Sequence, residues 1–240
     1  MAKLILIHGA WHGAWCWRDL LPLLQKQEIQ FIAEDLPGSG QSTYEGEITL
    51  DAYVTSIEES LKEVDEPAIL LGHSMGGMVA SLVAERNSDQ VKKIIYVSSV
   101  LLKDGQSWAM TRVKNVGSTL NHYVVPSQQT GFAEVDPKGL RESFYHRCSE
   151  EQIEFAHRYI RPQAKGPFET PIQLTEKNYG NIPKYYIRCL QDRALVPEFQ
   201  IETSLATPCK EIFEIQSDHS PFFSASKELA QIVGQVVSDE

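Results

Sequence analysis

The chain has 240 residues, 42% of them hydrophobic, and a formal net charge of −10. This length accommodates one α/β domain or two small ones. The acidic balance disfavours nucleic acid and anionic membranes as partners, because both attract clustered lysine and arginine, and no apolar run approaches the length of a membrane span. The four cysteines have neither CxxC pairing nor zinc-site spacing, which favours reduced thiols and a cytoplasmic location.

The first predicted strand is the apolar run 4–7, which ends in a glycine-rich loop with the sequence HGAWHG. A wholly apolar strand is typical of a sheet covered by helices on both faces. In serine hydrolases, the loop after such a strand supplies one N–H group to the oxyanion, and by its position this donor is Ala10. Gly9 lets the backbone approach the substrate, and Trp11 is a candidate wall of the substrate pocket.

Two other features of the first forty residues could be taken for a metal site and for a catalytic acid. His8 and His12 are four residues apart, but a glycine-rich loop does not place them on one face as a helix would, so we predict no metal site. Asp35 resembles a catalytic acid. It precedes the candidate nucleophile and lies in a turn-rich loop, which favours a structural role.

Helical and apolar stretches alternate along much of the chain. This alternation predicts a parallel sheet covered by helices, with the site at the carboxyl ends of the strands. The predicted strands are 4–7, 30–33, 67–71, 93–97, 185–190 and 211–215. The predicted helices are 15–27, 49–64, the segment after the nucleophile, 198–206 and 224–237.

The motif that organises the chain is GHSMG at 72–76, which has the pattern G-x-S-x-G between an apolar strand and a helix. A serine on such a sharp turn adopts strained backbone angles and exposes its hydroxyl above the sheet. Gly72 and Gly76 leave room for the turn. The following helix offers free N–H groups at its start. Ser74 is therefore the predicted nucleophile, and the N–H of Met75 is the second predicted oxyanion donor.

A serine hydroxyl needs a base in contact with it and an acid that orients the base. In folds with this motif the order along the chain is serine, acid, histidine. His219 follows the strand 211–215 and is the predicted base. Asp192 directly follows the strand 185–190 and is the predicted acid. We reject Asp218 as the orienting acid, because adjacent residues on an extended turn point apart.

Residues 101–180, called the cap below, interrupt the alternation and are rich in large apolar side chains. Helical spacing appears near 138–147 and 149–160. We interpret this stretch as an insertion over the site that selects the substrate and excludes water. Residues 1–100 and 181–240 then form the core domain.

Several stretches together carry a family resemblance that spans nearly the whole chain. They read HGAWHGAWCW, GHSMGG, CLQDRALVPEFQ and SDHSPFFS, with CSEEQI and RP in the cap at 148–153 and 161–162. In these stretches the chain resembles the plant methyl esterases and hydroxynitrile lyases of the α/β-hydrolase fold. The resemblance implies a mostly parallel six-stranded sheet, a mixed cap and, as is frequent in the subfamily, a homodimer.

Two positions distinguish the esterases from the lyases of this subfamily. The lyases usually have a threonine after the first strand's histidine and a lysine after the catalytic histidine, whereas this chain has Gly9 and Ser220. A lyase would thus lack a fixed cation for departing cyanide. We therefore predict a serine carboxylic ester hydrolase for small-molecule esters that needs no cofactor. A hydroxynitrile lyase and a ligand-binding receptor on the same fold are the alternatives.

Overall fold

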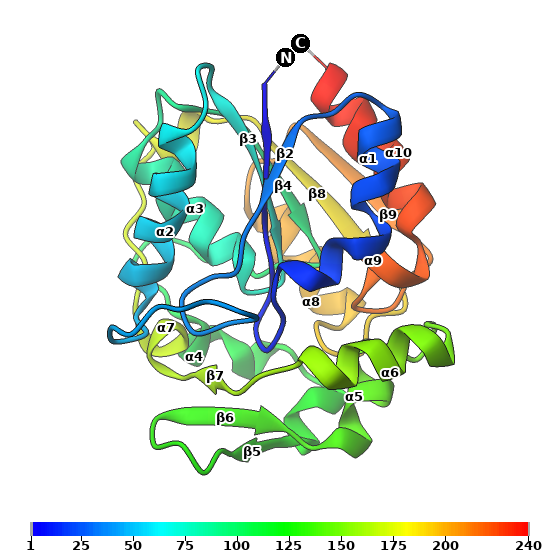
Figure 1. The fold of residues 1–240 in the computed structure, drawn as a ribbon. Helices are drawn as coiled ribbons and strands as arrows, with labels where there is room; N and C mark the ends of the chain where they lie inside the picture. Colours follow the sequence, from blue (N-terminus) through cyan, green and yellow to red (C-terminus); the bar gives the residue numbers. More distant parts are fainter. Residues whose placement is uncertain (1, 240) are drawn as a thin grey trace.

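A six-stranded sheet runs through the centre of the computed structural model, which describes residues 2–239 (Figure 1). Its strand order is β2-β1-β3-β4-β8-β9, and every neighbouring pair is parallel. The strands are β1 (Leu4–Ile7), β2 (Phe31–Ala33), β3 (Ala68–His73), β4 (Val91–Val97), β8 (Lys184–Cys189) and β9 (Glu211–Ile215). The strands β1, β3 and β8 are buried along their whole length, as expected for a sheet covered on both faces. The predicted α/β-hydrolase sheet is confirmed.

Helices lie on both faces of this sheet, with α2 and α3 on one side and α1 and α10 on the other (Figure 1). The core helices are α1 (Leu21–Lys26), α2 (Leu50–Lys62), α3 (Gly76–Arg86), α8 (Pro197–Ala206), α9 (Pro221–Ser224) and α10 (Ser226–Ser238). The single helix predicted for 15–27 is divided into the 3-10 turn η1 (Ala14–Asp19) and α1. Pro22 lies in the first turn of α1, where its missing N–H costs nothing, so a new helix begins there.

The cap lies beyond the carboxyl ends of the central strands (Figure 1). Its helical elements are α4 (Trp108–Thr111), η2 (Arg112–Lys114), η3 (Thr119–His122), α5 (Pro137–Phe144), α6 (Glu150–Tyr159) and α7 (Gly166–Glu169), and η4 (Tyr179–Asn181) stands at the boundary with the core. The helical spacing predicted near 138–147 and 149–160 corresponds to α5 and α6. Three short antiparallel strands, which the sequence did not predict, complete the cap: β5 (Val124–Pro126), β6 (Phe132–Val135) and β7 (Gln163–Ala164).

The first strand of the cap is exposed along its length, so it lacks the apolar alternation by which a strand is recognised. The helix α6 is better marked in the sequence. Ser149 and Gln152 form a reciprocal capping box at its start. Among residues 2–239, no helix has the length and apolar character needed to cross a bilayer.

Candidate active site

Ser74 stands on the turn between β3 and α3 with a φ angle of 53°, in the left-handed region that L-residues rarely adopt. The turn is tight, because a Cβ atom on Gly72 would lie 2.7 Å from the carbonyl oxygen of Gly76. The carbonyl oxygen of Ser74 accepts hydrogen bonds from the hydroxyl of Ser99 at 2.8 Å and from the N–H of Val100 at 3.1 Å. These bonds hold the strained turn from the neighbouring strand β4.

The structure pairs the predicted base with the predicted acid. The Nδ1 atom of His219, after β9, lies 2.7 Å from Oδ2 of Asp192, after β8, and both side chains are almost fully buried. The other carboxylate oxygen accepts hydrogen bonds from the N–H groups of Ala194 at 2.7 Å and Leu195 at 2.9 Å. These contacts fix the carboxylate, which holds the proton of His219 on Nδ1 and leaves Nε2 as the acceptor.

Sequence reasoning missed two residues that hold this pair. The hydroxyl of Ser98 donates a hydrogen bond to Oδ2 of Asp192 and lies 3.2 Å from Nδ1 of His219. The ring of His73, whose pKa burial lowers well below its usual value, is neutral and donates from Nε2 to the carbonyl oxygen of His219 at 2.8 Å. The position of Ser98 in the sequence could have revealed it. Ser98 follows β4, and β4 neighbours β8, the strand that precedes Asp192.

The predicted oxyanion donors Ala10 and Met75 line the same cavity as Ser74 and His219. Within the described part of the chain, neither N–H group donates a hydrogen bond to another group. Met75 stands at the N-cap of α3, where N–H groups have no partner inside the helix. Two free N–H groups beside a serine are the arrangement that stabilises a developing oxyanion.

A histidine behind the loop orients the peptide group of Ala10. Burial lowers the pKa of His12 to about 3, so its ring is neutral. Its Nδ1 atom donates to the carbonyl oxygen of Ala10 at 2.7 Å, and its Nε2 atom accepts from the hydroxyl of Tyr145 at 2.7 Å. The cap residue Tyr145 thereby fixes the backbone of the core loop.

Trp11 forms part of the cavity wall and adopts a φ angle of 62°. Its backbone N–H donates to Oε1 of Gln163 at 3.2 Å, and its indole N–H donates to the carbonyl oxygen of Ala133 at 3.0 Å. Both acceptors belong to the strands of the cap. The loop after β1 is therefore fastened to the cap at this residue.

Gly9, predicted to contact the substrate, is not among the residues that line the cavity. A Cβ atom there would lie 2.8 Å from Nδ1 of His73 and 2.9 Å from Cβ of Ser74. The structure thus places this glycine against the back of the serine turn. Its missing side chain lets the loop and the turn approach each other.

The groups rejected as catalytic from the sequence hold loops instead. Asp35 accepts hydrogen bonds from the N–H groups of Ala14 at 2.6 Å and Gln41 at 2.7 Å. Asp218 accepts from the N–H groups of Ser220 at 3.0 Å and the cap residue Arg147 at 2.8 Å. Residues 2–239 contain no group of three or more histidine, cysteine, aspartate or glutamate side chains placed to hold a metal ion.

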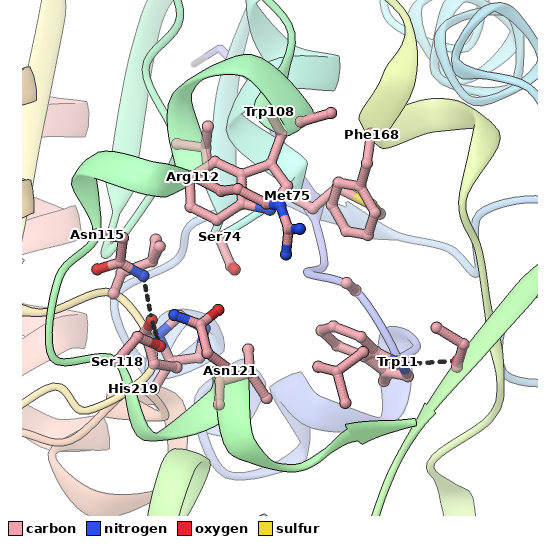
Figure 2. Close-up of a pocket in the computed structure, with 18 of the residues that line it drawn as sticks. Trp11, Ser74, Met75, Trp108, Arg112, Asn115, Ser118, Asn121, Phe168 and His219 are labelled. Carbon is pink, nitrogen blue, oxygen red and sulfur yellow. Dashed lines mark hydrogen bonds between the residues drawn. The ribbon is translucent and has the colours of Figure 1, made fainter. Parts of the chain in front are cut away.

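The cavity above Ser74 has a volume of about 360 Å³ and lies between the core and the cap (Figure 2). Apolar side chains form much of its wall, including those of Trp11, Trp108, Leu120, Phe144, Phe168 and Leu195. Ser74 and His219 face this space from the core. The predicted nucleophile and base therefore line one cavity, together with the residues of the two predicted oxyanion donors.

A parallel sheet with a serine on a strand-to-helix turn and a buried Asp–His pair is the architecture of an α/β hydrolase. The model of the alpha/beta hydrolase family matches residues 4–232. The chain belongs to this family. Methylesterase 7 of Arabidopsis thaliana is 30% identical to the chain over 251 residues, with 98% of this chain and 95% of that protein covered. The predicted place among relatives of the plant methyl esterases is confirmed.

A second relative and a solved structure extend this comparison. A chloroplastic protein of Arabidopsis thaliana, classed as methylesterase 13, is 30% identical over 250 residues, which cover 98% of this chain and 56% of that protein. The chain thus spans about half the length of this relative. The crystal structure of polyneuridine aldehyde esterase matches with a TM-score of 0.88 at 23% identity, covering 100% of both chains, and supports the fold.

The predicted cytoplasmic location is contradicted by these comparisons. Relatives from Arabidopsis thaliana, methylesterase 13 among them, are named as chloroplastic proteins. The prediction rested on the composition of the chain and its cysteines. Targeting depends on address segments that receptors read, and the composition of a folded domain does not report them.

Proposed function

We propose that this protein is a serine carboxylic ester hydrolase that acts on small-molecule esters through an acyl-enzyme. The observation that carries this proposal is the buried pair of His219 and Asp192, 2.7 Å apart, in the wall of the cavity that Ser74 also lines. A histidine that a carboxylate orients toward a serine is the general base that a serine nucleophile needs. The methylesterase relatives support the same reaction class.

In the proposed reaction, Ser74 Oγ attacks the acyl carbon while Nε2 of His219 takes the hydroxyl proton. The N–H groups of Ala10 and Met75 stabilise the oxyanion, and Asp192 stabilises the imidazolium that forms. His219 then protonates the leaving alcohol. Water, deprotonated by the same ring, attacks the acyl carbon, and His219 returns this proton to Oγ of Ser74 as the bond to the acyl group breaks and the acid product leaves. Every step uses groups of the chain, so the reaction needs no cofactor.

The direct test compares the wild type with Ser74→Ala on 4-nitrophenyl esters from acetate to octanoate and on methyl esters of aromatic acids. We expect turnover to fall by about a thousandfold or more, because the nucleophile is removed. Ser56→Ala is the matched control, since the hydroxyl of Ser56 lies on α2 and donates to the carbonyl oxygen of Tyr53. Full ester turnover in Ser74→Ala would refute the proposal.

The same proposal is testable without a known substrate. A fluorophosphonate reagent should add to Ser74 and increase the mass of the intact protein by the mass of its phosphonyl group. Neither Ser74→Ala nor His219→Ala should react at a comparable rate, because nucleophile and base are both needed. A reagent adduct on another serine, with Ser74 unmodified, would contradict the assignment.

The lyase alternative lacks support at the position after the base. Ser220 is fully buried, and its hydroxyl has no hydrogen-bond partner within the described residues. It offers no positive charge to a departing cyanide. Cyanide release from mandelonitrile faster than ester cleavage would nevertheless favour the lyase. For the receptor alternative, the diagnostic result is ligand-induced thermal stabilisation without turnover of any ester.

The cap and a homodimer are parts of the same proposal. The division into a core of 1–100 and 181–240 and a cap of 101–180 is supported by the cavity, whose wall combines residues of both. A homodimer is supported by exposed apolar side chains on η2 and α8, among them Val113 and Leu205, 74% and 70% exposed. Light scattering of the wild type and of Leu205→Glu tests it, because a charge on this surface should release monomers.

A further inference from the structure

Two cationic side chains are among those that line the cavity. Arg112 of η2 and Lys165 of the cap both contribute to its wall, together with the single carboxylate of Glu169. Positive charge therefore exceeds negative charge among the residues that line the cavity. The whole chain has a formal net charge of −10, so the charge of the cavity lining is opposite in sign to the net charge of the protein. A cationic side chain at the cavity wall of an acidic protein favours anionic ligands at that point.

The guanidinium of Arg112 is not used by the fold. Within residues 2–239 it has neither a hydrogen-bond partner nor an ion-pair partner. Its neighbour on η2, Lys114, is paired with Glu202 at 2.8 Å outside the cavity. Figure 2 shows the guanidinium of Arg112 pointing into the cavity, toward the space that Ser74 and Phe168 also face. An unpaired arginine beside apolar walls is suited to bind a carboxylate through two parallel hydrogen bonds.

We propose that Arg112 binds a carboxylate of the substrate, so that the preferred substrates are half-esters of small dicarboxylic acids. This inference rests on the proposed ester hydrolysis at Ser74. The apolar side chains of Trp108 and Phe168 would contact the methylene chain between the two ends of such a molecule. A cavity of about 360 Å³ is at the small end of ligand sites, which commonly measure about 300–1,000 Å³.

The test compares two esters that differ only in the charged end. Mono-4-nitrophenyl adipate and 4-nitrophenyl hexanoate share the acyl chain, with a carboxylate in place of the terminal methyl group in the adipate. We expect the wild type to prefer the half-ester in kcat/KM. In Arg112→Gln the ratio of the two kcat/KM values should fall by about tenfold, because one hydrogen-bonded charge pair is lost. An unchanged ratio would overturn the inference.

Two further variants sharpen the result. Lys114→Gln removes a positive charge from the same turn η2 at a position outside the cavity, so both kcat/KM values should stay as in the wild type. Lys165→Gln should lower the ratio by less than Arg112→Gln, because an ammonium lacks the planar pair of donors. Raising the salt concentration from about 0.05 M to about 0.5 M should reduce the wild-type preference. Equal losses in all three variants would indicate an unspecific charge effect and overturn the assignment.

A binding measurement separates this inference from the proposed function. Monomethyl adipate is titrated by calorimetry into Ser74→Ala and into the double variant Ser74→Ala/Arg112→Gln, neither of which can form an acyl-enzyme. About tenfold weaker binding in the double variant supports the carboxylate site even if the wild type turns over no ester. Turnover of the hexanoate ester without preference for the half-ester, and equal binding by both variants, would refute this inference and leave the esterase intact.

Discussion

The hydroxyl of Ser98 donates a hydrogen bond to Oδ2 of Asp192, the same oxygen that accepts from Nδ1 of His219. Three residues at the ends of three strands thus meet at one carboxylate oxygen. A carboxylate that accepts several hydrogen bonds is held in place and stays available to orient the histidine. Ser98 is therefore a positioning residue for the proposed base.

Ser98→Ala should lower kcat by about tenfold and leave KM nearly unchanged. One hydrogen bond to a charged group is lost, which corresponds to about 1.5 kcal/mol. Steady-state kinetics on a 4-nitrophenyl ester measures both constants, and Ser56→Ala on α2 serves as the control. A rise in KM with kcat unchanged would contradict the positioning role, because it would indicate altered substrate binding instead.

Tyr145→Phe should weaken the link between the cap and the oxyanion loop. The Nε2 atom of His12 loses its donor inside the protein, which should reduce the free energy of unfolding by about 1–2 kcal/mol and reduce kcat. Urea denaturation and ester turnover measure the two effects. Tyr123→Phe is the matched control, since its hydroxyl donates to Glu142 within the cap. If both variants were equally stable and active, the link would have no role.

Acid should destabilise the fold through buried histidines. Burial lowers the pKa values of His8, His12 and His73, that of His12 to about 3. Above about pH 6.5 these rings are neutral in both states. As the pH falls below that value, the unfolded chain binds protons that the folded chain does not, so the free energy of unfolding falls by about 1.4 kcal/mol per pH unit for each ring.

Urea denaturation between about pH 7.5 and about pH 5.5 measures this slope. His12→Gln should reduce the slope by a fraction of a proton at about pH 6.5 that approaches about one proton at about pH 5.5, because it removes one of the three rings. The comparison is made between slopes, so a general loss of stability in the variant does not affect it. A wild-type stability that is independent of pH over this range would contradict the prediction.

Gly9→Ala should destabilise the fold by about 1–3 kcal/mol and strongly reduce turnover. The added Cβ atom would lie 2.9 Å from Cβ of Ser74, so the loop or the nucleophile has to move. Gly166→Ala is the matched control, because its nearest neighbour, the carbonyl oxygen of Ile48, would lie 3.5 Å away. Thermal unfolding and ester kinetics are measured for both. Equal behaviour of the two variants would show that the loop tolerates a side chain at position 9.

Local pattern was the basis for predicting the nucleophile, the base and the acid. Ser74 lies in the turn after an apolar strand, and Asp192 and His219 lie in the loops after two further strands. Parallel strands bring their carboxyl ends to one edge of the sheet. The same reasoning missed Ser98 because it searched the segment after β4 for a catalytic acid. That segment contains no carboxylate, and a serine hydroxyl is not an acid of this kind. It also read one helix at 15–27, where the backbone geometry at Pro22 separates two elements.

The contacts between cap and core could not be predicted from the sequence. His12 and Tyr145 are 133 residues apart, and Trp11 and Gln163 are 152 apart. The periodicity or spacing of residues in one segment does not indicate which distant segment it contacts. The exposed strand β5 likewise carried no pattern, because alternation arises only where one face of a strand is buried.

The sequence alone indicated the alternating strands and helices of the core, the sharp turn at Ser74 and the candidate partners of its hydroxyl, because each signal comes from residues that are close together in the chain. The tertiary structure decided which side chains face one another across the cavity. It placed Ser98 in hydrogen-bond contact with Asp192, linked the loop after β1 to the cap, and left the Arg112 side chain without a partner among residues 2–239. These outcomes depend on the packing of segments far apart in the chain, where close contact selects one arrangement that no local pattern encodes.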